Sequence, residues 1–590
     1  MSSPPDPQPE PREASASPLI WGEDGAPRSR LFDDVYFSKA DGLAETRTVF
    51  LQGCGLPEAW AGRTRFVAGE LGFGTGLNIL ALLHLWRSTR EPDARLHVFS
   101  IEAYPLAADE AARALAAWPE LADLAGLMLA AWPRRARGFH RMQLPALGAT
   151  LDLAVMDAAE ALAAWGGRAD AWFLDGFAPA RNPLMWSDAV LAAVAEHSAP
   201  GARAATFTVA GAVRRGLAAQ GFAVEKRPGF GHKRERLEAR APGEPASSTP
   251  APATVAVVGA GVAGAALARA LAAEGLTCLV IEAVAGGGGA SGNPAALVMP
   301  RLDAGGGRVA QLYAQAFHRA VDLYGQTAAV IARGVLQLAA EPRDEGRFER
   351  VAASGLFAPD VLARLDAAGA AEQLGEPVKA AALAFAEGLV IEPAAVLEAW
   401  LGGADRRIAR VARLEPDAGG WRLLGASGEE IARAGVVCIA AGVESASLVS
   451  SAPLAPVRGQ VSLVRSAQAA VRAAIGAGYI APTRDGLLFG ATHDRGQVGC
   501  EVTAADHARN LDLLGRLRPA LAATLRDQPL DGRASLRAAT PDYLPLAGAV
   551  EGAEGLYILS GLGSRGFCTA PLLAEHVAAL IAGAPSPLPV

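Results

Sequence analysis

The sequence contains little cysteine, with five residues in a chain of 590 and no Cys-x-x-Cys pair. They are Cys54, Cys278, Cys438, Cys500 and Cys568. Disulfide scaffolds and structural zinc sites use cysteines at short, paired spacings. Because that spacing is absent, we expect reduced thiols and no metal site.

The sequence also lacks a long apolar run. Its most apolar stretch, residues 256–281, is interrupted by Arg269, Glu274 and several glycines. The first 18 residues are rich in proline, include acids and have no apolar core. A membrane span needs about 20 apolar residues, and a secretory signal needs an apolar centre. We therefore expect a cytoplasmic protein with no membrane partner.

Lysine is scarce as well, at four of the 54 basic residues, and the net charge is −7. This balance argues against a protein that coats nucleic acid non-specifically. Two stretches are basic locally: residues 203–240 hold nine Lys/Arg against three Asp/Glu, and residues 134–141 hold four arginines and no acid. These stretches are either contacts for a phosphate backbone or ordinary solvated surface.

The chain is too long for one domain, since domains commonly run to about 100–250 residues. Residues 1–18 are predicted to be a disordered tail. Pro, Ala and Ser dominate residues 239–253, which we interpret as a linker. The predicted domains are therefore residues 19–238 and 254–590.

Both predicted domains alternate strand-like apolar runs with helical stretches rich in Ala and Leu. In the first domain, the apolar runs at 66–73, 96–103, 151–158 and 171–177 each have an acid or a glycine near their carboxyl end. This alternation is typical of an α/β fold with a doubly wound, largely parallel sheet.

A glycine-rich turn follows the first of these strands. It carries Glu70, Gly72, Gly74 and Gly76. Glycine lets the backbone approach a ligand, and the helix that follows directs N–H groups toward it. Glu102 ends the next strand, where an acid accepts hydrogen bonds from ribose hydroxyls, and Asp157 ends a third, where we expect it to contact adenine. The pattern predicts binding of S-adenosyl-L-methionine; the alternative is a tight turn without a function.

Asp175 follows a further strand, at the carboxyl edge where open sheets place their reactions. Methyl transfer to an amine needs a lone pair on the nitrogen, so a carboxylate is required to orient the amine and take its proton. We predict this role for Asp175; the alternative is a helix N-cap or turn aspartate. Phe177 and Trp186 fit the wall of an acceptor pocket and fit a core equally well.

The second domain opens with a dinucleotide-binding fingerprint. A strand at 254–258 leads into Gly259, Gly261 and Gly264 at the start of a helix, and Glu282 ends the next strand. This spacing puts a pyrophosphate at the helix N-terminus and the acid on a ribose, which disfavours NADP.

Later segments favour FAD over NAD. Ser291 lies in the run 289–302 after the second strand, and Gly561 and Gly563 lie in a strand–turn–helix segment at 555–567. A helix N-terminus there would face the flavin pyrimidine and stabilise the reduced ring. We predict all three residues in the flavin site.

An arginine is expected in the flavin site if the oxidised amine carries a carboxylate, because a guanidinium holds a carboxylate with two parallel hydrogen bonds. Arg537 is the first candidate and Arg565 the second. The alternative for each is a surface or ion-paired arginine.

Longer motifs cover nearly the whole chain after residue 18. They are residues 32–38, 42–60, 70–78, 170–183, 205–217 and 229–237 in the first domain, and 289–302, 490–495, 540–545 and 561–575 in the second. Through these motifs the sequence resembles the MnmC family of bifunctional tRNA 5-methylaminomethyl-2-thiouridine biosynthesis proteins.

The resemblance implies a class I methyltransferase domain of Rossmann-like fold, followed by an FAD-binding Rossmann domain of the D-amino-acid oxidase type with an α+β substrate subdomain. It implies that the second domain oxidatively removes the carboxymethyl group from 5-carboxymethylaminomethyl-2-thiouridine at the tRNA wobble position. The first domain then methylates the remaining amine with S-adenosyl-L-methionine. The anticodon arm would contact the basic stretches and present the wobble base to each pocket. The oligomeric state stays open, and a monomer is compatible with the sequence.

Two other functions stay open from the residues alone. One is a fused oxidase and N-methyltransferase for small amines or amino acids, since the flavoprotein fold serves many amines. The other is an RNA-binding scaffold with degenerate sites, against which the intact glycine turns and the acids Glu102, Asp175 and Glu282 argue.

Overall fold

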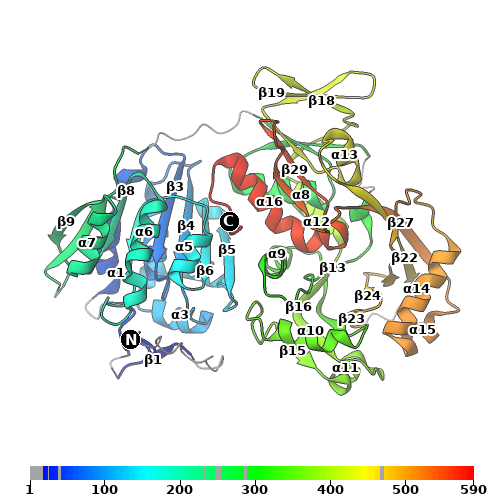
Figure 1. Cartoon of the computed structure of the whole chain (residues 1–590), viewed down its shortest axis with the longest axis horizontal. Helices are drawn as coiled ribbons and strands as arrows, with labels where there is room; N and C mark the ends of the chain where they lie inside the picture. Colours follow the sequence, from blue (N-terminus) through cyan, green and yellow to red (C-terminus); the bar gives the residue numbers. More distant parts are fainter. Residues whose placement is uncertain are drawn as a thin grey trace, which may run out of the picture.

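The computed structural model describes residues 17–23, 25–37, 41–231, 233–245, 254–284, 289–465 and 471–590. These form two lobes, one blue to green and one green to red, with the C-terminal residue between them (Figure 1). Residues 1–16 of the predicted tail and 246–253 of the predicted linker lie outside the described residues.

An eight-stranded sheet forms the centre of the N-terminal lobe, in the order β5-β6-β4-β3-β7-β8-β10-β9. Its parallel strands are β3 (Arg65–Leu71), β4 (Arg95–Ile101), β6 (Ala149–Val155), β7 (Ala169–Leu174) and β8 (Ser198–Thr206). Its antiparallel pairings are made by β5 (Gly138–Leu144), β10 (Glu235–Arg240) and β9 (Ala223–Pro228). A small hairpin of β1 (Leu19–Trp21) and β2 (Pro27–Ser29) precedes it.

Helices cover both faces of this sheet. In β3, Phe66 packs into one core and Val67 into the other, because successive side chains of a strand point to opposite faces. The first face is covered by α2 (Leu77–Thr89) and α4 (Ala122–Ala130), near α1 (Gly42–Thr46) and α3 (Ala108–Leu115). The second is covered by α5 (Ala158–Ala164), α6 (Asp188–Glu196) and α7 (Gly211–Ala219). Burial on both faces explains why these strands read as continuous apolar runs, and the doubly wound prediction is confirmed.

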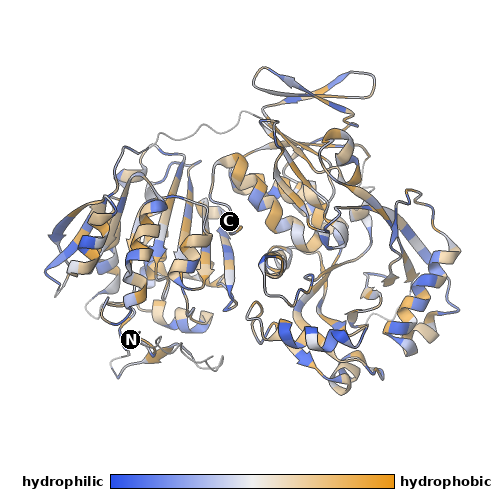
Figure 2. Ribbon diagram, in the orientation of Figure 1, coloured by the Kyte–Doolittle hydropathy of each residue, from blue (hydrophilic) through white to orange (hydrophobic). Residues whose placement is uncertain are grey.

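The C-terminal lobe contains a second largely parallel sheet, in the order β17-β12-β11-β21-β29-β28. Its strands are β11 (Val255–Val258), β12 (Cys278–Glu282), β17 (Asp405–Ile408), β21 (Val436–Ile439), β28 (Leu546–Ala549) and β29 (Leu556–Ser560). Helices α8 (Val262–Ala273) and α16 (Gly566–Ala582) pack on it in one hydrophobic core. Figure 2 shows α16 as largely hydrophobic, whereas β9 at the edge of the first sheet is largely hydrophilic.

A ten-stranded mixed sheet completes the α+β part of this lobe. Its strands are β13 (Ala296–Val298), β14 (Val330–Leu338), β15 (Leu362–Leu365), β16 (Ala382–Ile391), β22 (Ala455–Arg465), β23 (Ala473–Ile475), β24 (Tyr479–Pro482), β25 (Gly486–Gly490), β26 (Asp494–Arg495) and β27 (Asp531–Ala539). The other α-helices of this lobe are α9 (Arg308–Gly325), α10 (Arg343–Ala352), α11 (Ala367–Leu374), α12 (Pro393–Leu401), α13 (Ser445–Leu448), α14 (Ala504–Leu517) and α15 (Pro519–Leu525). A three-stranded sheet of β18 (Arg413–Asp417), β19 (Gly420–Leu424) and β20 (Glu430–Ala434) projects from the lobe (Figure 1).

Buried polar contacts join the two lobes. Arg319 on α9 pairs with Glu575 on α16 at 2.6 Å and also donates to the backbone oxygen of Arg141 on β5 at 3.0 Å. Nearby, Arg65 on β3 reaches Glu274, which follows α8, at 2.8 Å. The Arg319–Arg141 hydrogen bond and the Arg65–Glu274 ion pair cross between the lobes. Removing one partner of such a shielded pair would leave a buried charge without a counter-charge, which is costly.

Candidate active sites

The predicted methyl-donor turn follows β3 and depends on glycine. Gly72, Gly74 and Gly76 have φ values of +89°, +53° and +79°, in the left-handed region. A Cβ on Gly72 would lie 3.1 Å from the backbone oxygen of Asp175, and a Cβ on Gly74 would lie 3.2 Å from the Tyr36 ring. The turn thus brings bare backbone to the carboxyl edge of the sheet, beside Asp175.

Two acids, Glu70 and Glu102, lie beside this turn. Glu70 is fully buried; the Ser100 hydroxyl donates to one of its oxygens at 2.5 Å, while the other has no hydrogen-bond partner among the described residues. Burial raises the pKa of Glu70 to about 8. Glu102 accepts from the backbone N–H groups of Gly74 at 3.0 Å and Tyr104 at 2.8 Å. A buried carboxyl oxygen without a partner, next to open backbone, fits a ligand that carries an ammonium group, such as S-adenosyl-L-methionine, because a nearby positive charge favours the ionised form of Glu70.

Asp157 lies further along the same edge. It is the N-cap of α5, accepts from the Ala159 N–H at 2.9 Å and is exposed. Its contact with adenine stays a prediction.

Asp175 is the terminal member of a partly buried hydrogen-bond chain. The Thr46 hydroxyl donates to the Asn78 amide oxygen at 2.8 Å, and the Asn78 amide nitrogen donates to Asp175 at 2.7 Å. The Gly176 N–H donates to the second carboxylate oxygen of Asp175 at 2.8 Å. Burial raises the pKa of Asp175 to about 6. An oriented carboxylate with this pKa is ionised at neutral pH and able to accept a proton.

Sequence reasoning missed Thr46 and Asn78. Asn78 lies only two residues after Gly76, in the first turn of α2, so an amide directly behind the glycine turn was an available signal. Thr46 has no such signal, because it ends α1, 32 positions earlier in the chain.

Aromatic rings cover the space beside Asp175. Phe32 stacks on Phe177 with ring centres 4.8 Å apart, and Tyr36 meets Phe177 edge-on at 5.3 Å. Trp186 is buried and donates its indole N–H to the backbone oxygen of Phe177 at 2.9 Å. Phe177 therefore fits the wall of an acceptor pocket, while Trp186 belongs to the core beneath it.

The dinucleotide fingerprint lines a cavity of about 710 Å³ in the C-terminal lobe. Gly259 and Gly264 pack so closely that a Cβ on Gly264 would lie 1.8 Å from the Gly259 oxygen. The Ala260 N–H donates to the Glu282 carboxylate, and the Val262 N–H donates to the Ser291 hydroxyl at 2.9 Å. Gly261 and Glu282 also line the cavity, so these residues form a cradle that fits a dinucleotide such as FAD.

The opposite wall of the cavity comes from the end of the chain. Gly561 and Gly563, with φ values of +69° and +55°, both line it. Helix α16 begins three residues after Gly563, and Gly566 at its N-terminus also lines the cavity. The structure therefore brings together segments that are about 300 residues apart in the sequence.

Both candidate arginines line this cavity. The Arg537 guanidinium lies over Gly459 of the neighbouring strand, where a Cβ would be 2.2 Å from its Nη1 atom. Arg537 also donates to the backbone oxygen of Thr492 at 3.4 Å. Arg565 lies at the start of α16, where burial lowers its pKa. Neither arginine has an ion-pair partner among the described residues, so a carboxylate on a substrate can supply one.

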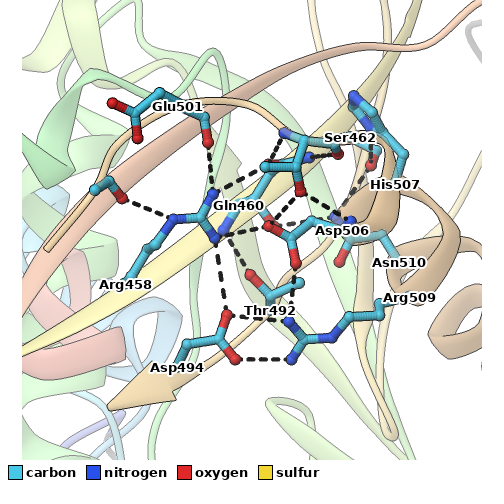
Figure 3. Close-up of polar contacts among 12 residues, drawn as sticks. Arg458, Gln460, Ser462, Thr492, Asp494, Glu501, Asp506, His507, Arg509 and Asn510 are labelled. Carbon is cyan, nitrogen blue, oxygen red and sulfur yellow. Dashed lines mark hydrogen bonds and ion pairs between the residues drawn. The ribbon is translucent and has the colours of Figure 1, made fainter. Parts of the chain in front are cut away.

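A polar cluster behind the cavity, drawn in Figure 3, fixes the loop that follows β26. Arg458 is 5% exposed and donates to the backbone oxygens of Gly499 at 2.7 Å and Glu501 at 2.6 Å. Arg458 also pairs with Asp506 at 2.7 Å. The loop carries Cys500, which lines the cavity, so the cluster shapes the cavity wall. Its members come from segments about 30 to 50 positions apart, and sequence reasoning did not find them.

The basic stretch at 134–141 is exposed at Arg135 and Arg137, but Arg134 and Arg141 pair with acids, so neither of the two alternatives, phosphate contact or solvated surface, holds for these two arginines. Arg134 donates to Asp322 at 2.6 Å and Glu387 at 2.8 Å in the other lobe. Arg141 is buried and donates to both oxygens of Asp152 at 2.7 and 2.6 Å. The reason is position: β5 is the edge of the first sheet against which the C-terminal lobe packs.

The stretch at 203–240 lies at the opposite edge, on β8, α7, β9 and β10. Strand β9 is mostly exposed, and ion pairs link Lys226 to Glu235 at 2.8 Å and Lys233 to Glu45 at 3.0 Å. Contact of this stretch with RNA stays a prediction.

Comparison with known families agrees with this geometry. Residues 254–580 match the family model for FAD dependent oxidoreductases, and residues 119–242 match that for S-adenosyl-L-methionine-dependent methyltransferases. Fold and sites together therefore define a methyltransferase domain joined to a flavoprotein oxidoreductase domain. The predicted cofactors, FAD and S-adenosyl-L-methionine, agree with these families.

Relatives match along nearly the whole chain. A tRNA 5-methylaminomethyl-2-thiouridine biosynthesis bifunctional protein from Caulobacter sp. (strain K31) is 59% identical over 584 residues, covering 98% of this chain and 96% of that protein. The protein of the same name from Caulobacter vibrioides is 60% identical over 577 residues, covering 97% and 95%. The chain belongs to this MnmC family, and the predicted resemblance is confirmed.

Among solved structures, iminodiacetate oxidase from Chelativorans sp. BNC1 is similar at 23% identity and a TM-score of 0.49, covering 56% of this chain and 96% of that one. No helix within the described ranges is long and apolar enough to cross a membrane.

Proposed function

We propose that this protein completes the 5-methylaminomethyl-2-thiouridine modification of tRNA in two steps in the cytoplasm. The C-terminal lobe removes the carboxymethyl group from 5-carboxymethylaminomethyl-2-thiouridine at the wobble position. The N-terminal lobe then methylates the exposed amine. Family membership over nearly the full chain and the two sites in one molecule support this assignment.

In the first step, Arg537 binds the carboxylate of the carboxymethyl group and holds the adjacent methylene inside the cavity. FAD, when bound, supplies the hydride acceptor for that methylene. Water then adds to the resulting carbon–nitrogen double bond, and the two-carbon unit leaves as an aldehyde acid. The product is the aminomethyl form of the base.

In the second step, Asp175 orients the aminomethyl nitrogen and accepts its proton, so that the nitrogen lone pair is free. S-adenosyl-L-methionine supplies the methyl group. Asn78 holds the Asp175 carboxylate in place, and the Phe32–Phe177 pair provides a flat wall for the uracil ring.

The observation that carries the proposal is that one chain holds both charged groups that the two steps need. A guanidinium lies in the flavin cavity, and a half-buried carboxylate lies beside the methyl-donor turn. An amine oxidase alone would need the first group and not the second. A fused oxidase and N-methyltransferase for small molecules would need both, and the near-full-length match to tRNA-modifying relatives favours tRNA over that alternative.

The test is mass spectrometry of wobble nucleosides in tRNA from a strain that lacks the gene. We expect the carboxymethylaminomethyl form to accumulate, and purified protein with S-adenosyl-L-methionine to convert it to the methylaminomethyl form. Protein with Arg537→Ala should leave the first form, and protein with Asp175→Ala should stop at the aminomethyl form. An unchanged tRNA profile in the deletion strain would refute the tRNA assignment and favour a small-molecule substrate.

A further inference from the structure

Tyr543 has an unusual backbone conformation in the loop between β27 and β28. Its φ is +60°, in the left-handed region that residues other than glycine rarely adopt. The Tyr543 N–H donates to the Thr540 oxygen at 3.2 Å, the Thr540 hydroxyl donates to the Leu544 oxygen at 2.7 Å, and the Tyr313 hydroxyl reaches the Tyr543 oxygen at 3.5 Å. Strain of this kind persists only where the surroundings fix it, and it gathers at functional sites.

This backbone presents the Tyr543 ring at the surface, where the residue is 39% exposed. The Arg495 guanidinium lies over the ring, with its central carbon 5.0 Å from the ring centre. Arg495 ends β26, and the preceding Asp494 is held by Arg509 through contacts of 2.9 and 3.1 Å (Figure 3). The ring and the guanidinium therefore contact each other, and the Asp494–Arg509 ion pair anchors the strand that carries Arg495.

The pair lies next to the flavin cavity. Val457 on β22 is the register partner of Arg495 on β26 and also of Arg537 on β27. Since register partners point to the same face and strands lie about 4.8 Å apart, the Cα atoms of the two arginines are about 10 Å apart on one face. Burial and then the charges of Arg537 and Arg495 lower the pKa of His493, which lines the cavity.

We propose that Tyr543 and Arg495 form a stacking platform for a base next to the wobble uridine. Splayed bases of single-stranded RNA stack on aromatic rings and on guanidinium planes, and such surfaces tolerate any base. With a neighbouring base on the platform, the modified uridine enters the cavity and its carboxylate reaches Arg537. This inference deepens the proposed function and rests on it, because it assigns the rim of the same cavity to the same RNA.

The test compares variants on two anticodon stem-loops that carry 5-carboxymethylaminomethyl-2-thiouridine. One has its natural loop, and the other has abasic sites at both neighbours of the wobble uridine. The variants are Tyr543→Ala and Arg495→Gln, with Tyr543→Phe as the conservative change. Arg526→Gln, at an exposed position just after α15, is the charge-matched control.

For the natural loop we expect Tyr543→Ala to raise KM about ten-fold, the size of one stacked base, with kcat and the flavin absorbance spectrum unchanged. Arg495→Gln should raise KM less, Tyr543→Phe should restore it, and Arg526→Gln should leave it unchanged. On the abasic loop, KM of the unsubstituted protein should be about ten-fold higher than on the natural loop. Tyr543→Ala should not raise KM on the abasic loop any further.

Equal effects of Tyr543→Ala on both loops would overturn the platform, since the side chain would then act independently of the neighbouring bases. A lower kcat or an altered flavin spectrum in that variant would assign Tyr543 a structural role in the cavity instead. Absence of turnover by the unsubstituted protein on the natural loop would count against the proposed function itself, which separates the two failures.

Discussion

In the proposed mechanism, burial of one carboxyl group sets the acid limit of methyl transfer. The pKa of Asp175 is about 6, because burial raises it while the Asn78 amide lowers it by stabilising the ionised form. Asn78→Ala should therefore move the acid limb of the kcat/KM profile for methylation upward, by about one pH unit or less. Steady-state methylation of aminomethyl tRNA between pH 5 and 9 measures this shift. If Asn78→Ala leaves the acid limb of the kcat/KM profile unchanged, Asp175 is not the group that titrates in that limb.

The same burial makes Asp175 destabilising when it is ionised. Its pKa rises from 3.8 in the unfolded chain to about 6 in the fold, so the folded state loses stability as pH rises through this interval. Asp175→Asn should remove up to about 3 kcal/mol of this penalty. We expect a higher melting temperature of the methyltransferase lobe, with a larger gain at pH 8 than at pH 5, measured by calorimetry without ligand. If Asp175→Asn raises the melting temperature equally at pH 5 and pH 8, the charge of Asp175 is not the cause of the increase.

At the scale of secondary-structure elements, the pairing of β22 with β27 positions Arg537, the proposed carboxylate-binding group. Gly459 leaves room for the Arg537 guanidinium, and a Cβ there would lie 2.2 Å from Nη1. Gly459→Ala should displace the guanidinium, which is the movable end of a long side chain, so the fold should persist. We expect KM of the oxidative step to rise about ten-fold or more, roughly the loss of one charge-assisted hydrogen bond. Flavin absorbance and methylation should be unchanged.

A matched control exists at Gly403, where an added Cβ would meet nothing within 4 Å. Gly403→Ala should leave both activities unchanged. If Gly459→Ala also leaves KM unchanged, Arg537 does not bind the substrate from its observed position.

At the scale of the whole molecule, Glu575 pairs with the two arginines, Arg319 and Arg269, that donate to Gln143 on β5 of the other lobe. It is fully buried, and the charges of Arg319 and Arg269 outweigh its burial and lower its pKa to about 2. Glu575→Gln would leave two arginines buried without a counter-charge, and breaking such a pair costs about 3–5 kcal/mol. We expect a melting temperature several degrees lower, measured by thermal denaturation. Glu430→Gln, in an exposed ion pair on β20, is the control and should change it little.

Much of each site could be predicted from the sequence because its parts are local. Gly72 and Gly74 lie within one turn, and Glu102 and Asp175 end strands of the same parallel sheet. Parallel strands place their carboxyl ends on one edge, so strand order in the chain is enough to bring such residues together. The same reasoning applies to Gly259, whose turn and following helix are contiguous.

What the sequence determined by itself is the pair of cofactor turns, the two α/β domains and the family to which the chain belongs. Only the tertiary structure decided that Arg141 is buried against the second lobe, that Asn78 orients Asp175, and that Gly459 makes room for Arg537. These outcomes depend on contacts between segments that are distant in the sequence. The packing of those segments decides whether a charged side chain contacts water, a carboxylate or a substrate, and the neighbouring residues in the chain do not.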